Sequence, residues 1–312
     1  CIDVSSAVRD EATPRINNKG LTYPDRTPKD VYYYFQALWR KDIPVIHIAS
    51  RDWSSRAGVQ SAPGAPVVMP VKVYTNQPEV KLWLNGQLVG TQRAANCFAV
   101  FQVPFTEGRC LLYAEAAGDN TVNDAVEVKF AATPLTLNAS NMKGREIAVN
   151  VGSNCSYTSE ASGLTWLPDQ AYQPGSWGYV GGKEAVTQTE ILRTVEGPLY
   201  QSSRTALEGY RFDVPAGQYE VELHFAAQKN SAYELYLLGK TDGENAVEDS
   251  KFDVQINGQV VDPDVCPAVQ VGYFHAMPRT YIISVSEGEG LNITLPSSVG
   301  TNMLSAVKVR QL

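Results

Sequence analysis

The stretch LTWLPDQAYQPGSWGYVGG, residues 164–182, sets four large aromatic side chains among residues that form turns. Proline and glycine interrupt both helical and strand periodicity, so the stretch predicts a loop that holds flat rings in fixed positions. Exposed rings beside polar groups suit sugar-like ligands, because ring faces bury C–H surface while their neighbours bond hydroxyl groups. A second interpretation stays open, in which the rings plug the end of a β-sandwich and belong to its core.

The composition around this stretch is that of a folded, acidic protein. The chain has 312 residues, a length typical of about two domains. Its formal net charge is −7 and no run of basic residues stands out, so nucleic acid is not the expected partner. No segment has the roughly 18 consecutive apolar residues of a membrane-spanning helix.

The five cysteines are scattered, with no CxxC pair and no cluster with histidine. This pattern favours free, mostly buried thiols over a disulfide framework or a metal site. The chain begins at Cys1 without a methionine, which indicates a mature product or an excised fragment.

Residues 29–39, KDVYYYFQALW, predict a helix. Thr27 is the expected N-cap and Pro28 the expected first helical residue. Val31, Tyr34, Phe35 and Leu38 share one helical face, which should pack against a neighbour.

The run RDEATPRINNKGLTYPDRTPKDVYYYFQALW, residues 9–39, resembles the end of the catalytic barrel of glycoside hydrolase family 2, of the β-galactosidase type. The matching residues are Asn17, Asn18, Lys19, Gly20, Leu21, Asp25, Arg26, Lys29, Asp30 and Tyr32 to Phe35. The resemblance implies that residues 1–42 are the last loop and helix of a barrel whose two catalytic glutamates lie on earlier strands. We therefore expect no catalytic residue here and no activity of this chain alone, since glycoside hydrolysis needs two carboxylates on one rigid scaffold.

Residues 43–133 predict an immunoglobulin-like β-sandwich. Six short alternating segments follow one another, and Asn85-Gly86 between two apolar runs is a strong hairpin signal. The phrase VYTNQPEVKLWLNGQLVG, residues 73–90, resembles the sandwich modules that follow the barrel in family 2 enzymes. His47 lies within an alternating strand pattern and is expected to be structural.

Residues 134–312 predict a second sandwich, of jelly-roll type. Strand-like segments separated by Gly and Pro turns dominate, and Asn257-Gly258 is a second hairpin signal. Residues 181–194 carry a weak helix signal. Residues 234–249 read as an acidic loop whose carboxylates do not have EF-hand spacing, so a solvated face is favoured over calcium.

This second region resembles the malectin-like carbohydrate-binding domain, which implies a β-sandwich that binds oligosaccharide at loops on one end. The matching phrases are Gly163 to Trp166, Pro168 to Gln170, Gly175 to Gly178, Leu199 to Gln201, Tyr210 to Phe212, Tyr219 to Val221, His224 to Ala226, Phe252 to Val254, Ile256 to Gly258, and Leu304 to Ala306. The overall fold class expected for the chain is therefore all-β.

The same resemblance assigns candidate sugar-binding residues. Trp166 and Trp177 match the aromatic phrases of the family's site, with Tyr179 close by. Asp169, Tyr172 and Asn302 complete the predicted site, with Tyr233 or Tyr236 as candidates for a second aromatic pair. Arg204, near Leu199 to Gln201, is expected to stabilise the fold.

Three functions compete. The first is a non-catalytic, carbohydrate-binding C-terminal region of a family 2 glycoside hydrolase, with glycan and an upstream catalytic barrel as partners and a periplasmic or cell-surface location. The second is a purely structural or dimerisation module, marked by low exposure of both tryptophans. The third, an independent enzyme, is disfavoured because no G-x-S-x-G, H-E-x-x-H or P-loop motif is present, and no cofactor is expected.

Overall fold

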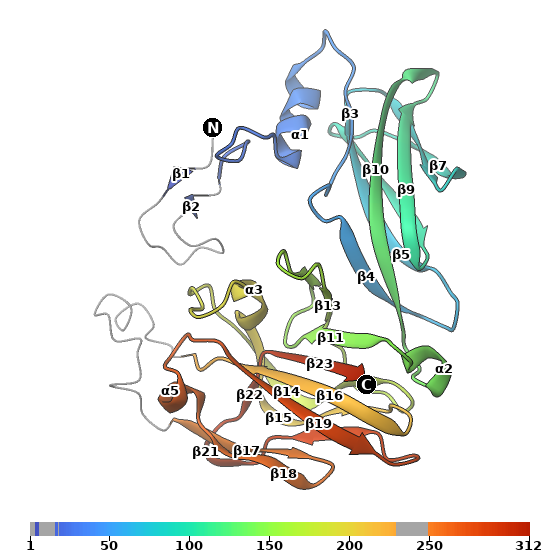
Figure 1. Cartoon of the computed structure of the whole chain (residues 1–312). Coiled ribbons are helices and arrows are strands. Elements are labelled where there is room, and N and C mark those ends of the chain that lie inside the picture. Colours follow the sequence, from blue (N-terminus) through green and yellow to red (C-terminus); the bar gives the residue numbers. More distant parts are fainter. Residues whose placement is uncertain (1–3, 6–15, 18, 229–248) are drawn as a thin grey trace. The chain divides into compact units, whose positions relative to one another are not determined.

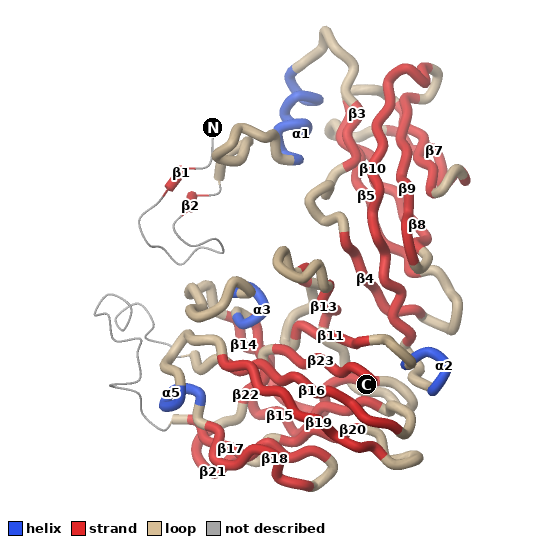
Figure 2. The backbone as a smooth tube through the Cα atoms, viewed as in Figure 1, coloured by secondary structure: helices blue, strands red, loops and turns tan. Residues whose placement is uncertain are grey.

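The computed structural model describes residues 4–5, 16–17, 19–228 and 249–312. Strands dominate both parts of the chain, which confirms the all-β class (Figure 2). The chain separates into two compact units that divide between Thr133 and Pro134. Tyr233, Tyr236 and residues 234–248 of the expected acidic loop lie outside the described residues.

The first unit is a two-sheet sandwich preceded by one helix. One sheet has the order β4-β10-β9-β6-β7 and the other β3-β5-β8. The elements are β1 (Val4–Ser5), β2 (Ile16–Asn17), α1 (Asp30–Trp39), β3 (Ile46–Ile48), β4 (Ser55–Gln60), β5 (Val67–Thr75), β6 (Glu79–Leu84), β7 (Gln87–Arg93), β8 (Phe98–Phe105), β9 (Gly108–Ala116) and β10 (Asp119–Pro134).

Alternation along β8 shows why this unit folds as a sandwich. Phe101, Val103 and Phe105 are buried in the core, whereas Gln102 and Pro104 between them are exposed. A period of two residues places one set of side chains on each face of a strand, so the buried set covers the opposite sheet.

Both predicted Asn-Gly hairpins are confirmed. Asn85 and Gly86 have φ values of 50° and 80° and join β6 to β7. Asn257 and Gly258 have φ values of 52° and 75° and join β17 (Ser250–Ile256) to β18 (Gln259–Val265). Two consecutive positive φ values match the right-handed twist of the paired strands.

Helix α1 forms, but its predicted cap and buried face are wrong. It begins at Asp30 after Lys29, and the Thr27 hydroxyl instead donates to the Asp25 carboxylate in a local turn. Only Ala37 is buried, and Val31 and Leu38 are exposed. The helix contacts its own unit through polar and aromatic groups.

His47 is structural, as predicted. Its ring is buried and lies flat on Tyr33, with centroids 3.8 Å apart, and its Nε2 lies 2.7 Å from the Asp30 carboxylate.

The second unit is a larger sandwich. Its sheets have the orders β12-β13-β11-β23-β16-β19 and β14-β15-β20-β17-β18, with β21 paired to β17 and β22 to β15. The further elements are α2 (Ala139–Met142), β11 (Glu146–Asn150), β12 (Tyr157–Thr158), β13 (Thr165–Pro168), β14 (Trp177–Val186), α3 (Gly197–Tyr200), β15 (Ser202–Phe212), β16 (Gly217–Phe225), α5 (Pro267–Gln270), β19 (Met277–Val285), β20 (Leu291–Thr294), β21 (Ser297–Gly300), β22 (Met303–Leu304) and β23 (Ala306–Gln311).

The weak helix expected over residues 181–194 is not there. Strand β14 continues through the first part of that segment to Val186, paired with β15 along its length. Tertiary pairing with β15 overrides the local helix signal, which β-branched residues had already weakened.

The four cysteines that the structure describes are free, as predicted. Cys110 and Cys266 are buried, Cys97 is partly buried and Cys155 is exposed. Among the described residues, no group of three or more His, Cys, Asp or Glu side chains is placed to hold a metal ion.

Candidate functional site

Both tryptophans of the predicted sugar site lie on strands and not in a loop. Trp177 begins β14 and is fully buried against Phe212, with ring centroids 6.3 Å apart. Trp166 lies on β13 and is only 5% exposed, with its ring edge-on to His224. Such low exposure of both tryptophans is the signature expected of the structural alternative.

Asp169 is buried in an ion pair. Its carboxylate lies 3.0 Å from Arg204 Nε and accepts hydrogen bonds from Gly152 N at 2.8 Å and from the Tyr210 hydroxyl at 3.0 Å. Burial raises the pKa of Asp169, although Gly152, Arg204 and Tyr210 act in the opposite direction. Arg204 therefore stabilises the fold, and Asp169 is its partner.

Tyr179 and Tyr172 are engaged with neighbouring side chains. The Arg204 guanidinium lies 3.4 Å from the Tyr179 ring centroid, a close cation–π contact. The Tyr172 hydroxyl donates to the Asp213 carboxylate at 2.7 Å.

Asn302 is buried and uses its whole amide to hold the chain before β22. Its Oδ1 accepts from Leu207 N at 2.7 Å, and its Nδ2 donates to the carbonyls of Leu207 and Leu295. Sugar binding by the six predicted residues stays a prediction, and none of them lines the groove described next.

An open groove in the second unit was not predicted from the sequence, and its lining includes Gly197 and Pro198 of α3, the helix labelled in Figure 1. It consists of two hollows of about 610 and 420 Å³ that share Pro198 and Gln201, and we call it the polar groove. The larger hollow is lined by Tyr157, Thr158, Glu160, Ala161, Glu190, Ile191, Thr194, Val195, Gly197, Pro198 and Gln201. The smaller is lined by Asn150, Gly152, Ser153, Asn154, Glu184, Val186, Thr187, Pro198, Gln201 and Ser202.

The floor of the smaller hollow is fixed by hydrogen bonds. The buried Asn150 accepts from the Ser202 hydroxyl at 2.9 Å, and Gln201 donates to Thr189 O at 3.1 Å. Gly152 has a φ of 75°, and a Cβ there would lie 2.1 Å from Ser203 O, so only glycine fits. Amides and hydroxyls held in place in this way suit a ligand rich in hydroxyl groups.

The wall of the larger hollow is held by Glu196. Its two carboxylate oxygens accept from the hydroxyls of Tyr157 and Ser159, each at 2.6 Å. Burial, followed by the bond to Glu196, raises the pKa of Tyr157 well above its ordinary value. The Tyr157 ring is thus fixed and only partly buried, beside the open hollow.

The polar groove was missed because its residues come from three separate segments, near residues 150–161, 184–195 and 197–202. The polar turn at Gly152 to Asn154, directly after an apolar strand pattern, was the one local signal.

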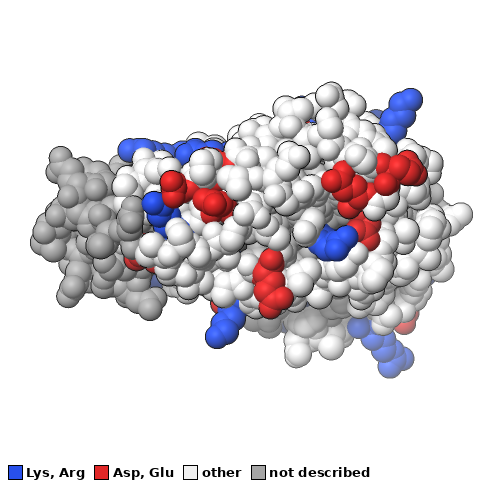
Figure 3. Space-filling view, turned by 90° about the horizontal axis from the view of Figure 1, so that it is seen from below, with Lys and Arg blue, Asp and Glu red and all other residues white. Residues whose placement is uncertain are grey.

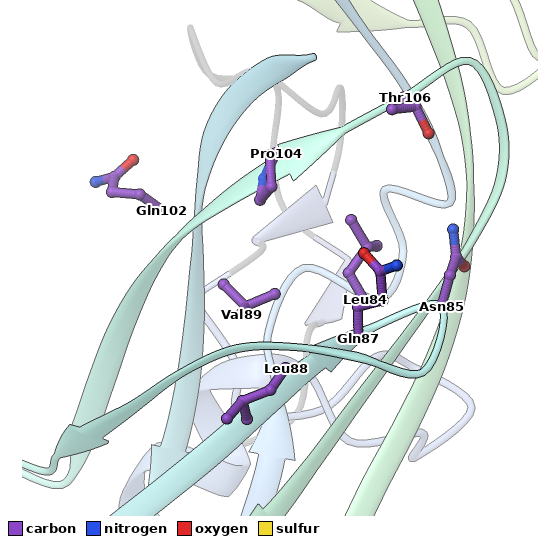
Figure 4. A pocket seen from close by; sticks show the side chains of 8 residues that line it. All are labelled: Leu84, Asn85, Gln87, Leu88, Val89, Gln102, Pro104 and Thr106. Atoms are coloured by element: carbon purple, nitrogen blue, oxygen red, sulfur yellow. The ribbon is translucent and has the colours of Figure 1, made fainter.

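A further hollow lies in the first unit, with a volume of about 470 Å³. Figure 4 shows Val89 and Pro104 on different strands, with Leu84, Asn85 and Gln87 grouped at the β6–β7 hairpin. None of the described residues that line this hollow is titratable or aromatic, so they offer neither acid–base chemistry nor a stacking surface.

Charge on the molecule is mixed. Figure 3 shows acidic and basic side chains on the same face, separated by wide areas without charge. None of the described helices has both the length and the hydropathy needed to cross a membrane.

Comparison with known proteins gives two family matches. The malectin domain matches residues 146–304, and a domain of unknown function (DUF4982) matches residues 67–122.

The relatives described next are β-glucuronidases, so the β-galactosidase type that the N-terminal residues implied is corrected to the β-glucuronidase type. A crystal structure of a Bacteroides uniformis β-glucuronidase is 49% identical, with a TM-score of 0.90, over 100% of this chain and 35% of that chain. A β-glucuronidase of Bacteroides fragilis is 30% identical over 132 residues, which are 41% of this chain and 18% of that protein. The chain thus spans about a third or less of the length of these relatives. Because the malectin match covers half of the residues, the chain belongs to the malectin domain family.

Proposed function

We propose that this chain is the non-catalytic C-terminal part of a β-glucuronidase-like enzyme and that its malectin domain binds carbohydrate in the polar groove. The groove itself carries the proposal. It combines about 610 and 420 Å³ of adjoining space with fixed amides, hydroxyls and a tyrosine ring. Such sites bind weakly, because a few hydrogen bonds compete with well-hydrated sugar.

The likeness to the Bacteroides uniformis β-glucuronidase supports the parent enzyme, since the alignment runs along the whole of this chain. The expected catalytic residues would then lie in the part of such an enzyme that this chain does not contain.

The proposal is tested by titrating the chain with neutral β-linked gluco-oligosaccharides and following amide NMR shifts. Asn154→Ala should weaken binding at least threefold while thermal stability is kept. Gln201→Ala, which also loses the bond to Thr189 O, should weaken binding at least as much at a small cost in stability. Gln218→Ala removes an exposed amide that does not line the groove and is the matched control. No binding at millimolar sugar, or equal loss in all three variants, contradicts a site in the groove. Loss only in Trp166→Ala would return the site to the aromatic stretch.

A structural role is the second candidate, and helix α1 favours it. Val31, Tyr32, Leu38 and Trp39 are all exposed on this short helix, and Trp39 is 66% exposed. A cluster of large apolar side chains on one element is typical of a surface that another part covers. Hydrogen exchange should be slower at residues 30–39 in a longer protein that includes the parent's upstream part. Equal exchange in both would reject this role for the helix.

A further inference from the structure

The polar groove is negatively charged. Glu160 and Glu190 line its larger hollow and Glu184 its smaller one, whereas none of the lysine, arginine or histidine residues that the structure describes lines either.

In the part of the chain that the structure describes, an arginine offsets some of the negative charge of the smaller hollow. Arg204 lies 3.4 Å from Glu184, so part of that charge is neutralised. In the larger hollow, Glu196 is held by two hydroxyl groups, which are neutral donors and leave its charge in place. Over the part of the chain that the structure describes, no ion pair involves Glu160 or Glu190. The larger hollow therefore keeps a negative field.

The negative charges of this hollow affect the pKa of the Tyr157 hydroxyl. After burial, the bond to Glu196 and the charges of Glu196 and Glu160 act together to raise the pKa of Tyr157. Carboxylates on two segments thus act on one point of the wall, and a ligand placed in the hollow experiences the same charges.

We propose that the polar groove selects sugars by charge, accepting uncharged or amine-bearing residues and excluding uronic acids. This inference rests on the proposed carbohydrate binding in the groove. In the larger hollow a sugar carboxylate would meet the like charges of Glu160 and Glu190 with no cation among the described lining residues, whereas an ammonium group would be attracted by them.

For a relative of β-glucuronidases, the simplest expectation is a module that binds glucuronate, and charge selection predicts the opposite. This malectin domain would not hold the glucuronate unit. It would hold a neutral or amino-sugar unit of the same glycan and leave the carboxylated unit free.

The effect is large enough to measure. Two carboxylates about 8 Å from a ligand charge in a water-like medium contribute about 1 kcal/mol and change affinity about fivefold in each direction. Raising NaCl from about 20 to about 500 mM should reduce both the gain for an ammonium sugar and the loss for a carboxylate sugar to threefold or less, because salt screens exposed charges.

The experiment compares three β-1,4-linked disaccharides of matched shape, built from glucose, from glucosamine, or with a terminal glucuronic acid. Dissociation constants are measured by NMR titration of the full 312-residue chain at both salt concentrations. The expected order of affinity is glucosamine above glucose above glucuronate, with the differences compressed at high salt.

A double variant, Glu160→Gln with Glu190→Gln, should bring the three affinities within threefold of one another. Glu208→Gln with Glu287→Gln removes two exposed carboxylates outside the groove and is the control for net charge. Circular dichroism verifies folding of both.

The outcomes separate the two proposals. Equal affinities for all three sugars, or tightest binding of the glucuronate, overturn charge selection and leave carbohydrate binding standing. Binding of none of the three at millimolar concentration overturns both. An equal effect of the control variant shows that net charge, and not the groove, does the selecting, which overturns this inference alone.

Discussion

Replacing Asp169 by asparagine should destabilise the second unit strongly. The substitution keeps the shape of the side chain but removes the charge that faces Arg204 at 3.0 Å, where the two side chains are only 2% and 5% exposed. Leaving a buried charge without its partner costs about 3–5 kcal/mol. We expect about 3 kcal/mol, the lower end, because Glu184 remains 3.4 Å from Arg204.

Breaking the Asp169–Arg204 ion pair is costly, although the intact pair adds little to the free energy of unfolding. Burial raises the pKa of Asp169 despite the neighbouring arginine, so the cost of removing water from the carboxylate exceeds the attraction. A double variant, Asp169→Asn with Arg204→Met, should therefore recover most of the stability that the single variant loses.

Thermal and urea unfolding, followed by circular dichroism, measure the effect. A loss of about 3 kcal/mol lowers the melting temperature by about 10 °C in a unit of this size. The control is Glu220→Gln, whose partner Arg310 lies 3.1 Å away on a far more exposed pair, and it should cost less than about 1 kcal/mol. If Asp169→Asn leaves stability unchanged but abolishes sugar binding, Asp169 is a ligand residue and the structural assignment is refuted.

Three further predictions concern the same unit. Gly163→Ala places a side chain at a φ of 71° with open space around it and should lower the free energy of unfolding by about 1 kcal/mol. In Gly152→Ala the new Cβ would also lie 2.1 Å from Ser203 O, so urea unfolding should show a loss at least twice as large. Equal losses would show that the contact with Ser203 O relaxes. Contact with His224, opposed by burial and helped by Lys308, lowers the pKa of Glu222 from 4.5 to about 2, so its contribution of about 3 kcal/mol is present above pH 4.5 and is lost as the pH falls towards 2. The stability difference between the protein and Glu222→Gln should accordingly shrink from pH 6 to pH 3, and a constant difference contradicts the assignment. In thiol titration with an aromatic disulfide, Cys155→Ser should remove one rapidly reacting equivalent, while Cys110 and Cys266 react only on unfolding; an unchanged rapid phase would place Cys155 out of reach.

The sequence predicted those features that depend on neighbouring residues. Both Asn-Gly turns follow from the positive φ values that only a few residue types adopt readily, and the buried face of β8 follows from strict alternation. The order of the malectin phrases identified the second unit correctly.

The exposure of side chains at the site was not predictable in the same way. Trp177 is buried because Phe212 lies on the strand paired with it, and that pairing joins residues 35 positions apart. The polar groove depends on three segments meeting at one end of a sandwich. Contacts between segments far apart in the sequence leave no local sequence pattern, so the burial of a tryptophan could not be predicted from its residue type.

The position of β23 bears on how the protein is made. This strand ends at Gln311, yet it lies in the interior of its sheet, with β11 on one side and β16 on the other. A ribosome releases the chain from its amino end, so β11 emerges about 155 residues before the strand that must pair with it. The sheet cannot close until β23 has left the exit tunnel. Until then the backbone N–H and C=O groups of β11 and β16 that pair with β23 stay open to chaperones, and deletion of residues 306–311 would leave both strand edges unpaired.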